Sequence, residues 1–263
     1  PFRGLGGTKD MSVARKEPLE LKYVSFLDTL HPRHACWILS VAAGVKPSAM
    51  IESVDFSGWD VFVELLEKMG MCFAYQSNKQ MVMGLADDQL DDFGLSKEKA
   101  GKGTYLLFDS SNWQRMLHGE PSNFDVCLES SSLRPNVKKG LDIQEVFVAR
   151  RPMQLIELAQ SRHGGPELKW DAMSAGKALG YPQCCIDSYI RLGSSGLASR
   201  RSFLRELKEE GMDQSMPVEF WSVYHIPCSA LCKRSIELGG SYLEAIRRYS
   251  ESLYSSVLDK LRC

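Results

Sequence analysis

The chain has 263 residues, of which 44% are hydrophobic and 25% are charged, and its 32 Lys and Arg residues nearly balance its 33 Asp and Glu residues. This composition is typical of a globular protein built as one large domain or as two unequal lobes. The balanced charge gives neither the basic signature of a nucleic-acid-binding domain nor a polybasic membrane anchor. Because we see no apolar run of about 20 residues and no hydrophobic leader, we expect no membrane association and a cytoplasmic location.

Apolar periodicity in the first half of the chain indicates both helices and strands. Helical spacing predicts helices over 32–43 and 59–69, with Gly70 placed to end the second. Short apolar runs at 71–75 and 81–85 predict a hairpin across the polar QSNKQ segment. Two strand-then-helix units follow, TYLLF with SSNWQRML and EVFVA with PMQLIELAQ, and the polar stretches between these units are expected to be surface loops.

The last third of the chain has a mainly helical pattern. One helix is expected to end at Gly180, another to span 182–193, and an apolar stripe to follow 241–261. The sequence therefore predicts an α+β fold with a mixed lobe over 1–165, which contains a small sheet, and a helical lobe over 166–263. The two lobes could also form one continuous domain.

The eight cysteines fall into an isolated set and a paired set. Cys36, Cys72, Cys127 and Cys263 are isolated, and the first three lie beside apolar residues, which predicts buried thiols that act as small hydrophobic groups. The other four form two pairs, both in the helical part of the chain.

Each cysteine pair is predicted to lie at the start of a helix. Cys184 and Cys185 follow GYP and would occupy the first helical turn, where the positive end of the helix dipole favours a thiolate. In HIPCSALC, Pro227 suits a first helical position, so Cys228 and Cys232 would lie one turn apart on one face. Two helix N-termini would thus present sulfur.

This arrangement indicates a metal site, because thiolate ligands must be deprotonated and His225 can add a nitrogen. The candidate ligands are Cys184, Cys185, Cys228, Cys232 and His225. Neighbouring helical residues point about 100° apart, so the two vicinal cysteines are not expected to bind in the same way. The most economical site has three sulfurs, from Cys228, Cys232 and one of the vicinal pair, with His225 or the other vicinal cysteine as the fourth ligand. Four ligands would suit structural zinc, whereas three would suit catalytic zinc or an iron–sulfur cluster, and the sequence leaves zinc and iron–sulfur undecided.

The functional hypothesis is a metal-binding small-molecule enzyme of unknown reaction. In this hypothesis His225 is a ligand or the general acid/base, and Cys184 is a supporting or reactive thiol in catalysis. Two alternatives stay open: a non-enzymatic interaction module stapled by structural zinc or disulfides, and a metal-free thiol redox protein. The enzyme would act on a small-molecule substrate, while a protein partner or a homo-oligomer is left undecided.

Other polar residues carry weaker signals. His31 and His34 are interpreted as capping or surface histidines, since no thiol or carboxylate accompanies them. His163, Asp171 and Asp187 are auxiliary candidates near the cysteines, with a solvated loop as the alternative. Hydrolase motifs such as G-x-S-x-G and H-E-x-x-H are absent from the sequence.

Two segments together resemble a known family. GKALGYPQCCIDSYI and YHIPCSALCKRSIELGGSYLEAI are similar to an uncharacterised, mainly prokaryotic domain of unknown function with the motifs L-G-Y-P-x-C-C and H-x-P-C-x3-C-x2-S. The resemblance covers roughly residues 170–250 and implies no activity. It implies that one motif set includes Gly180, Tyr181, Pro182, Cys184, Cys185, His225, Pro227, Cys228, Cys232 and Ser235.

Overall fold

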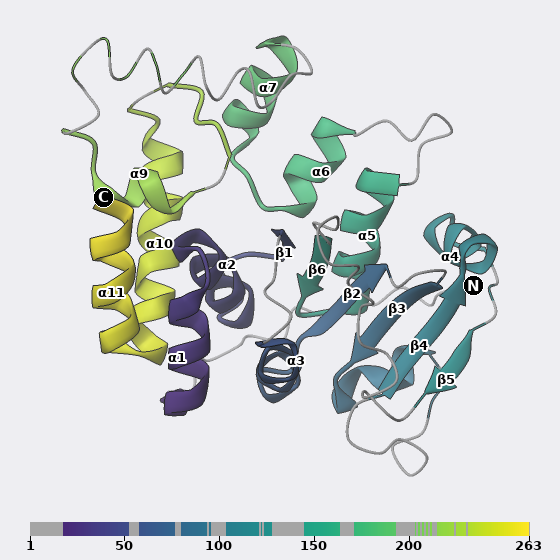
Figure 1. Ribbon diagram of the computed structural model, residues 1–263. Helices are drawn as coiled ribbons and strands as arrows, with labels where there is room; N and C mark the ends of the chain where they lie inside the picture. Colours follow the sequence, from purple (N-terminus) through teal and green to yellow (C-terminus); the bar gives the residue numbers. More distant parts are fainter. Residues whose placement is uncertain are drawn as a thin grey trace.

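The predicted α+β class is confirmed, because a mixed set of helices surrounds one antiparallel sheet (Figure 1). The computed structural model of the chain describes residues 18–52, 58–76, 80–93, 95, 104–120, 122, 124–127, 145–163, 171–192, 203, 205, 207, 209, 211, 215–223, 225–229 and 231–262. In chain order the elements are α1 (Leu21–Thr29), α2 (Pro32–Ala42), β1 (Ser48–Glu52), α3 (Trp59–Lys68), β2 (Cys72–Gln76), β3 (Gln80–Leu85), η2 (Asp87–Phe93), β4 (Thr104–Asp109), α4 (Ser110–Leu117), β5 (Asp125–Cys127), β6 (Glu145–Ala149), α5 (Pro152–His163), α6 (Ala172–Ala178), α7 (Gln183–Leu192), α9 (Val218–Ser222), α10 (Lys233–Tyr249) and α11 (Glu251–Arg262).

The sheet has the strand order β1-β6-β2-β3-β4-β5, and every neighbouring pair is antiparallel. The predicted hairpin is present as β2 and β3, and both strand-then-helix units form as β4–α4 and β6–α5. Asp109 ends β4 and caps α4, because its carboxylate accepts a hydrogen bond from the backbone N–H of Asn112 at 2.7 Å. Pro152 is the first residue of α5, as predicted.

Helices cover both faces of the sheet, so the strands have apolar side chains on both sides. Phe73 and Tyr75 of β2 pack into a core with α1, α2, α3, α10 and α11. Their neighbours Cys72 and Ala74 point to the opposite face, into a second core with α4 and α5. Cys36 and Cys72 are both fully buried, which confirms their prediction as hydrophobic thiols.

The helices α10 and α11 lie beside α1 and α2 (Figure 1) and complete the first core. Tyr242 and Ile246 of α10 pack in the same cluster as Tyr23 of α1 and Ile38 of α2. Segments from both sides of residue 165 therefore share one hydrophobic core, and the division into two lobes stays a prediction.

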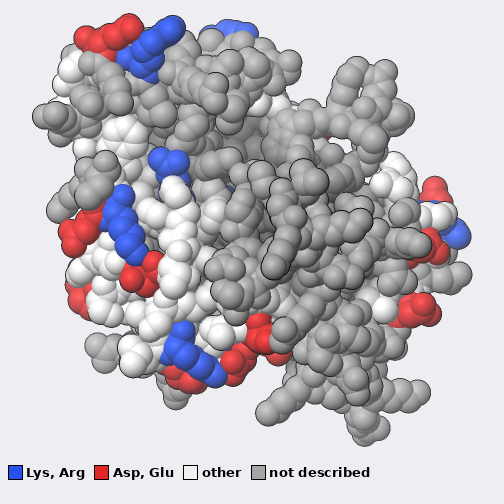
Figure 2. All heavy atoms as spheres, viewed as in Figure 1, with Lys and Arg blue, Asp and Glu red and all other residues white. Residues whose placement is uncertain are grey.

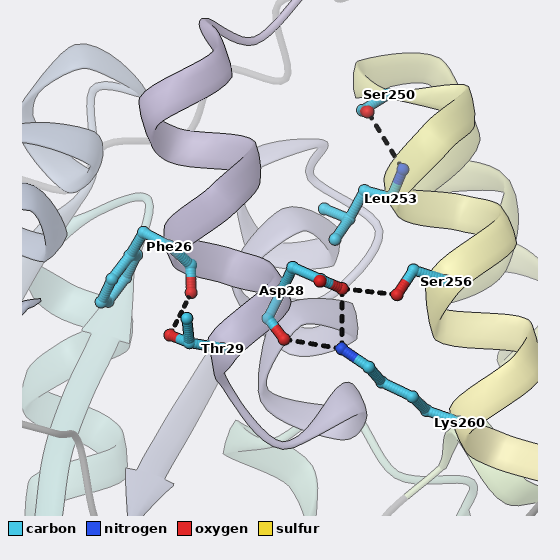
Figure 3. A network of polar contacts seen from close by, with 7 residues as sticks. All are labelled: Phe26, Asp28, Thr29, Ser250, Leu253, Ser256 and Lys260. Atoms are coloured by element: carbon cyan, nitrogen blue, oxygen red, sulfur yellow. Dashed lines mark hydrogen bonds and ion pairs between the residues drawn. The ribbon is translucent and has the colours of Figure 1, made fainter.

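Several elements differ from the sequence-based expectation. The apolar stripe over 241–261 is divided between two helices, because the chain turns at Ser250, whose side chain caps α11 by accepting from the N–H of Leu253 at 3.2 Å (Figure 3). The strand β5 lies inside a predicted loop. It has only three residues, too few to produce a recognisable alternation of apolar and polar positions.

A polar network joins α1 to α11 near the chain ends (Figure 3). Lys260 Nζ contacts Asp28 Oδ1 at 2.7 Å and donates to its backbone carbonyl at 2.6 Å, and Ser256 donates to the same carboxylate. The hydrogen bond from Lys260 is the main cause that lowers the pKa of Asp28. Because both side chains are roughly 40% exposed, the pair contributes at most about 1 kcal/mol.

The visible surface in Figure 2 shows basic and acidic side chains of the described residues next to one another. The described residues include ion pairs such as Lys22–Glu64 and Arg247–Glu244. Such a pattern produces no broad field of one sign over that part of the surface. Within the described ranges, we find no helix with both the length and the apolar character needed to cross a bilayer.

Gly239 allows α10 and α9 to cross closely. A Cβ at this position would collide with the backbone carbonyl of Glu219 and approach Ser222 Oγ at 2.7 Å, whereas a Cβ at Gly240 would meet only Glu219 Cγ at 3.6 Å. We expect Gly239→Ala to lower the free energy of unfolding by about 1–3 kcal/mol through overpacking. Gly240→Ala is the matched control and should be neutral or stabilising by up to about 1 kcal/mol. Urea unfolding of both variants tests this, and equal effects would contradict it.

Candidate metal centre

Four thiols from two separate segments converge in the structure. The sulfurs of Cys184 and Cys185 from the first turn of α7 meet those of Cys228 and Cys232 from the segment that leads into α10. All four sulfur atoms lie within 4.8 Å of one another, so this cluster could hold a metal ion. We call these four residues the cysteine cluster.

The sulfur–sulfur distances among Cys184, Cys185 and Cys232 are short and nearly equal. Cys185 Sγ lies 3.6 Å from Cys232 Sγ, and Cys184 Sγ lies 3.9 Å from both of these atoms. These separations far exceed the disulfide bond length of about 2.05 Å, and all four cysteines carry free thiols. Both sulfurs of the vicinal pair therefore lie in the cluster, which corresponds to the option with the other vicinal cysteine, and not His225, in the fourth position. Rotation about χ1 lets the two side chains converge although their Cβ atoms diverge.

The GYP segment places the vicinal cysteines. Gly180 has φ 71°, which ends α6 and reverses the chain, and the carbonyl of Pro182 then accepts hydrogen bonds from the N–H groups of Cys185 and Ile186. The helix assignment begins at Gln183, one residue after the expected start at Pro182. The prediction that both cysteines occupy the first turn of a helix is confirmed.

Two residues far away in sequence fix the same segment. Ser48 Oγ donates to the carbonyl of Ala178 at 2.6 Å, and the buried Lys46 Nζ donates to the carbonyl of Leu179. The Lys46 ammonium also lies 4.8 Å from the ring centroid of Tyr181. Burial lowers the pKa of Lys46 to about 7. A hydroxyl donor and a cation thus satisfy carbonyls that have no partner within the helix at the C-terminal end of α6, and they anchor the turn before the cysteines.

The second cysteine pair differs from its predicted conformation. Helix α10 begins at Lys233 with Cys232 as its N-cap, so Cys228 precedes the helix instead of lying on one of its faces. A turn with a 3.1 Å hydrogen bond from the N–H of Cys232 to the carbonyl of Ser229 folds the segment back. Proline at position 227 therefore precedes a loop, and the two sulfurs come together through this turn and not through helical spacing.

Two buried side chains, Ser235 and His225, are linked to the cluster by hydrogen bonds. Ser235 Oγ lies 3.2 Å from Cys185 Sγ and 2.8 Å from His225 Nε2, and the ring of His225 packs on Tyr181 at a centroid distance of 4.8 Å. The N–H of Cys228 also donates to Cys185 Sγ at 3.4 Å. The structure therefore places His225 beside Ser235, behind the sulfurs, where it can orient the serine hydroxyl toward Cys185.

The four thiols differ in their readiness to ionise. Burial raises the pKa of Cys185 far above its ordinary value, and burial together with the neighbouring Cys232 raises the pKa of Cys228 to about 11. Burial also acts against ionisation of Cys232, but hydrogen bonds from the side chain and backbone of Ser235 and from neighbouring thiols outweigh it and lower its pKa to about 7. Without a metal, the cluster thus concentrates its negative charge on Cys232.

The auxiliary candidates have local structural roles. Asp171 caps α6 by accepting from the N–H of Met173 at 3.0 Å, and Asp187 accepts from Gln183 Nε2 at 2.7 Å. His31 caps α2 by accepting from the N–H of Arg33, which agrees with its interpretation as a capping residue. Three predicted positions lie outside what the structure describes: the side chains of His163 and Cys127, and the whole residue Cys263.

A small apolar pocket borders this region. Its lining includes Phe203, Phe220, Trp221 and Val223, together with His225 and the two residues after it, Ile226 and Pro227. The volume of about 260 Å³ includes open solvent, so the enclosed space is much smaller than the usual range of about 300–1,000 Å³ for ligand sites. Of the polar stretches expected to be surface loops, the one over 85–103 contains the 3-10 helix η2, and much of the one over 119–140 lies outside the described residues.

The fold and this site define an α+β protein with a four-cysteine cluster that could hold a metal ion. Residues 131–254 match the model of a family described as "Protein of unknown function (DUF483)". This match confirms the resemblance to an uncharacterised family that the cysteine motifs indicate, and it spans every residue of the motif set. Neither the curated proteins nor the solved structures contain a match to the chain.

Lys46 and Ser48 were not found as supporting residues from the sequence. Both lie more than 120 positions before the carbonyls that they contact, and no local pattern marks a lysine for burial. Ser235, in contrast, belongs to the recognised motif set, and its position three residues after Cys232 is the signal that identifies it.

Proposed function

We propose that this protein binds one zinc ion through the cysteine cluster, with Cys184, Cys185, Cys228 and Cys232 as the four ligands. The observation that carries this proposal is the spacing of the sulfurs, 3.6–3.9 Å for the pairs among Cys184, Cys185 and Cys232, with all four sulfurs within 4.8 Å of one another. Four sulfurs at the corners of a tetrahedron with zinc–sulfur bonds of about 2.3 Å lie about 3.8 Å apart. The cluster therefore fits one tetrahedral ion with little rearrangement.

The same spacing favours a single ion over an iron–sulfur cluster. In a cubane iron–sulfur cluster each cysteine thiolate binds a different iron. The cysteine sulfurs must therefore lie farther apart there than around a single ion. The donor set also suits zinc, since closed sites with four thiolates are typical of structural zinc. When bound, the ion would supply a cross-link between distant parts of the chain.

In this proposal the ion joins the start of α7 to the loop before α10. The positive ends of both helix dipoles lie at the thiolates, and the N–H of Cys228 and the hydroxyl of Ser235 donate to Cys185. These interactions stabilise the negative charge of four thiolates around a divalent ion. His225 acts as an orienting residue for Ser235 and not as a ligand.

A closed four-sulfur site supports the structural alternative more than the enzyme hypothesis. Catalytic zinc keeps a coordination position for water or substrate, and four protein ligands occupy all positions of a tetrahedral ion. The neighbouring pocket is almost entirely apolar, with His225 as its polar group. The catalytic roles of His225 and Cys184 stay predictions, to be tested when a substrate is known.

Cobalt substitution tests the proposal directly. Metal-free protein titrated anaerobically with Co²⁺ should develop strong visible absorption of tetrahedral geometry and thiolate charge-transfer bands that saturate at one ion per chain. Zinc should displace the cobalt and bleach the spectrum. Weak octahedral absorption, or saturation well above one ion per chain, would contradict a single four-thiolate site.

The hydrogen bonds that link Cys185, Ser235 and His225 should raise the affinity of the cluster for the ion. We expect Ser235→Ala to weaken zinc binding about 10–100-fold, because it removes the hydroxyl that faces Cys185 and the partner of His225. Ser241→Ala is the matched control, since this exposed serine lies on the same helix and donates only to the carbonyl of Glu237. Competition with a chromogenic chelator measures both affinities. Equal affinities for the two variants would show that the serine has no such role.

A further inference from the structure

One side of the cysteine cluster faces solvent, and the other side is enclosed. Cys228 is exposed and Cys184 is half-buried, whereas Cys185 and Cys232 are buried with relative exposures of 2% and 6%. Cys185 Sγ is also engaged by the N–H of Cys228 at 3.4 Å and by Ser235 Oγ at 3.2 Å. A reagent that arrives from solvent therefore meets Cys228 first and Cys184 second.

We propose that Cys228 is a site of oxidation by hydroperoxides and that it forms a disulfide with Cys184, with release of the bound ion. Susceptibility of a cysteine follows its thiolate character and its exposure. Coordination keeps all four sulfurs as thiolates, so exposure decides which of them reacts. The release step rests on the proposed function, because it needs the ion that the cluster holds.

The chemistry balances with the peroxide as the sole oxidant. The Cys228 thiolate attacks one peroxide oxygen, so an S–O bond forms, the O–O bond breaks, and the sulfur loses two electrons to give a sulfenic acid. The leaving alkoxide or hydroxide takes a proton from solvent. The Cys184 thiolate then attacks the Cys228 sulfur, an S–S bond forms, and the departing hydroxide becomes water. Two of the four ligands are consumed, so the ion dissociates.

Geometry selects Cys184 as the resolving thiol. Its sulfur lies within 4.8 Å of Cys228 Sγ, and it is the other sulfur with access to solvent. A vicinal Cys184–Cys185 disulfide is disfavoured, since adjacent helical residues point about 100° apart and bonding would require the first turn of α7 to unwind. The proposed bond joins the same two segments as the ion, so oxidation replaces a metal cross-link with a covalent one.

The experiment treats full-length, metal-loaded protein of measured metal content with one equivalent of hydrogen peroxide. A chromogenic chelator follows the released metal, and fragmentation mass spectrometry assigns the disulfide after free thiols are blocked. We expect one ion released per disulfide, with Cys228 linked to Cys184. The buried thiols Cys36 and Cys72 are internal controls and should stay reduced.

A pair of variants tests the order of events. In Cys184→Ser the sulfenic acid at Cys228 has no preferred partner, so its dimedone adduct should increase at least about tenfold over the wild type. In Cys72→Ala, a thiol change outside the cluster, the Cys228–Cys184 disulfide should still form. The inference is overturned if Cys185 or Cys232 carries the first oxidised sulfur. Protein that takes up no zinc would instead refute the proposed function, whereas zinc-loaded protein whose first oxidised sulfur is not Cys228 overturns this inference alone.

Discussion

Cys232→Ser is expected to abolish stoichiometric zinc binding and to lower the free energy of unfolding. Cys232 combines ligand geometry with the lowered pKa that makes it the first thiolate of the cluster. Zinc binds the folded state and so adds to the free energy of unfolding, by about 4 kcal/mol when free zinc exceeds the dissociation constant about 1,000-fold. Loss of the ion removes this contribution. Urea unfolding with and without a chelator, together with elemental analysis, measures both effects.

Cys72→Ala is the control for this experiment. Cys72 is fully buried in the second core, and its thiol donates to the carbonyl of Ala149 at 3.3 Å. Its loss should cost about 1–2 kcal/mol through packing while the zinc content stays at one per chain. The account fails here if Cys232→Ser retains full zinc content, or if a chelator does not change the unfolding curve of the wild type.

Zinc affinity is expected to rise steeply with pH. At neutral pH, Cys185 and Cys228 are protonated, because burial raises both pKa values and that of Cys228 reaches about 11. Zinc must displace these protons, so at least two protons leave on binding, and the apparent affinity should increase about 100-fold per pH unit near neutrality. The sign follows directly: a lower pH supplies the competing protons, and a higher pH removes them.

Chelator competition at several pH values between 6.5 and 8.5, corrected for protonation of the chelator, measures this slope. The released protons could come from the thiols or from the imidazole of His225. The variant His225→Gln separates these two sources, since it removes the imidazole that is hydrogen-bonded to Ser235. The slope should persist in this variant because the thiols release the protons. A flat pH profile in the wild type would be incompatible with four thiolate ligands that start as thiols.

The parts of the fold that were predictable carry strong local signals. The hairpin β2–β3 and the units β4–α4 and β6–α5 have clear apolar periods and a proline at the start of α5. The short edge strand β5 has three residues and depends on pairing with β4, which only the folded chain provides. The break at Ser250 was missed because the apolar stripe continues at helical spacing through it.

The cysteine cluster was predictable as a set of residues, and its geometry was not. Proline at 182 marks the start of α7, but proline at 227 precedes a loop, so the same signal had two outcomes. The two vicinal sulfurs lie 3.9 Å apart within the cluster, although helical directions alone would separate them. The support from Lys46 depends on contacts across 133 residues, for which the sequence has no local signal.

The most direct test of a single zinc ion held by four cysteines is elemental analysis and absorbance of protein purified without oxygen. We predict a colourless protein with one zinc per chain and no labile sulfide, whose buried cluster thiols Cys185 and Cys232 resist alkylation until the metal is removed. A brown protein with iron and sulfide, or a metal-free protein whose cluster thiols react freely in the folded state, would contradict the account.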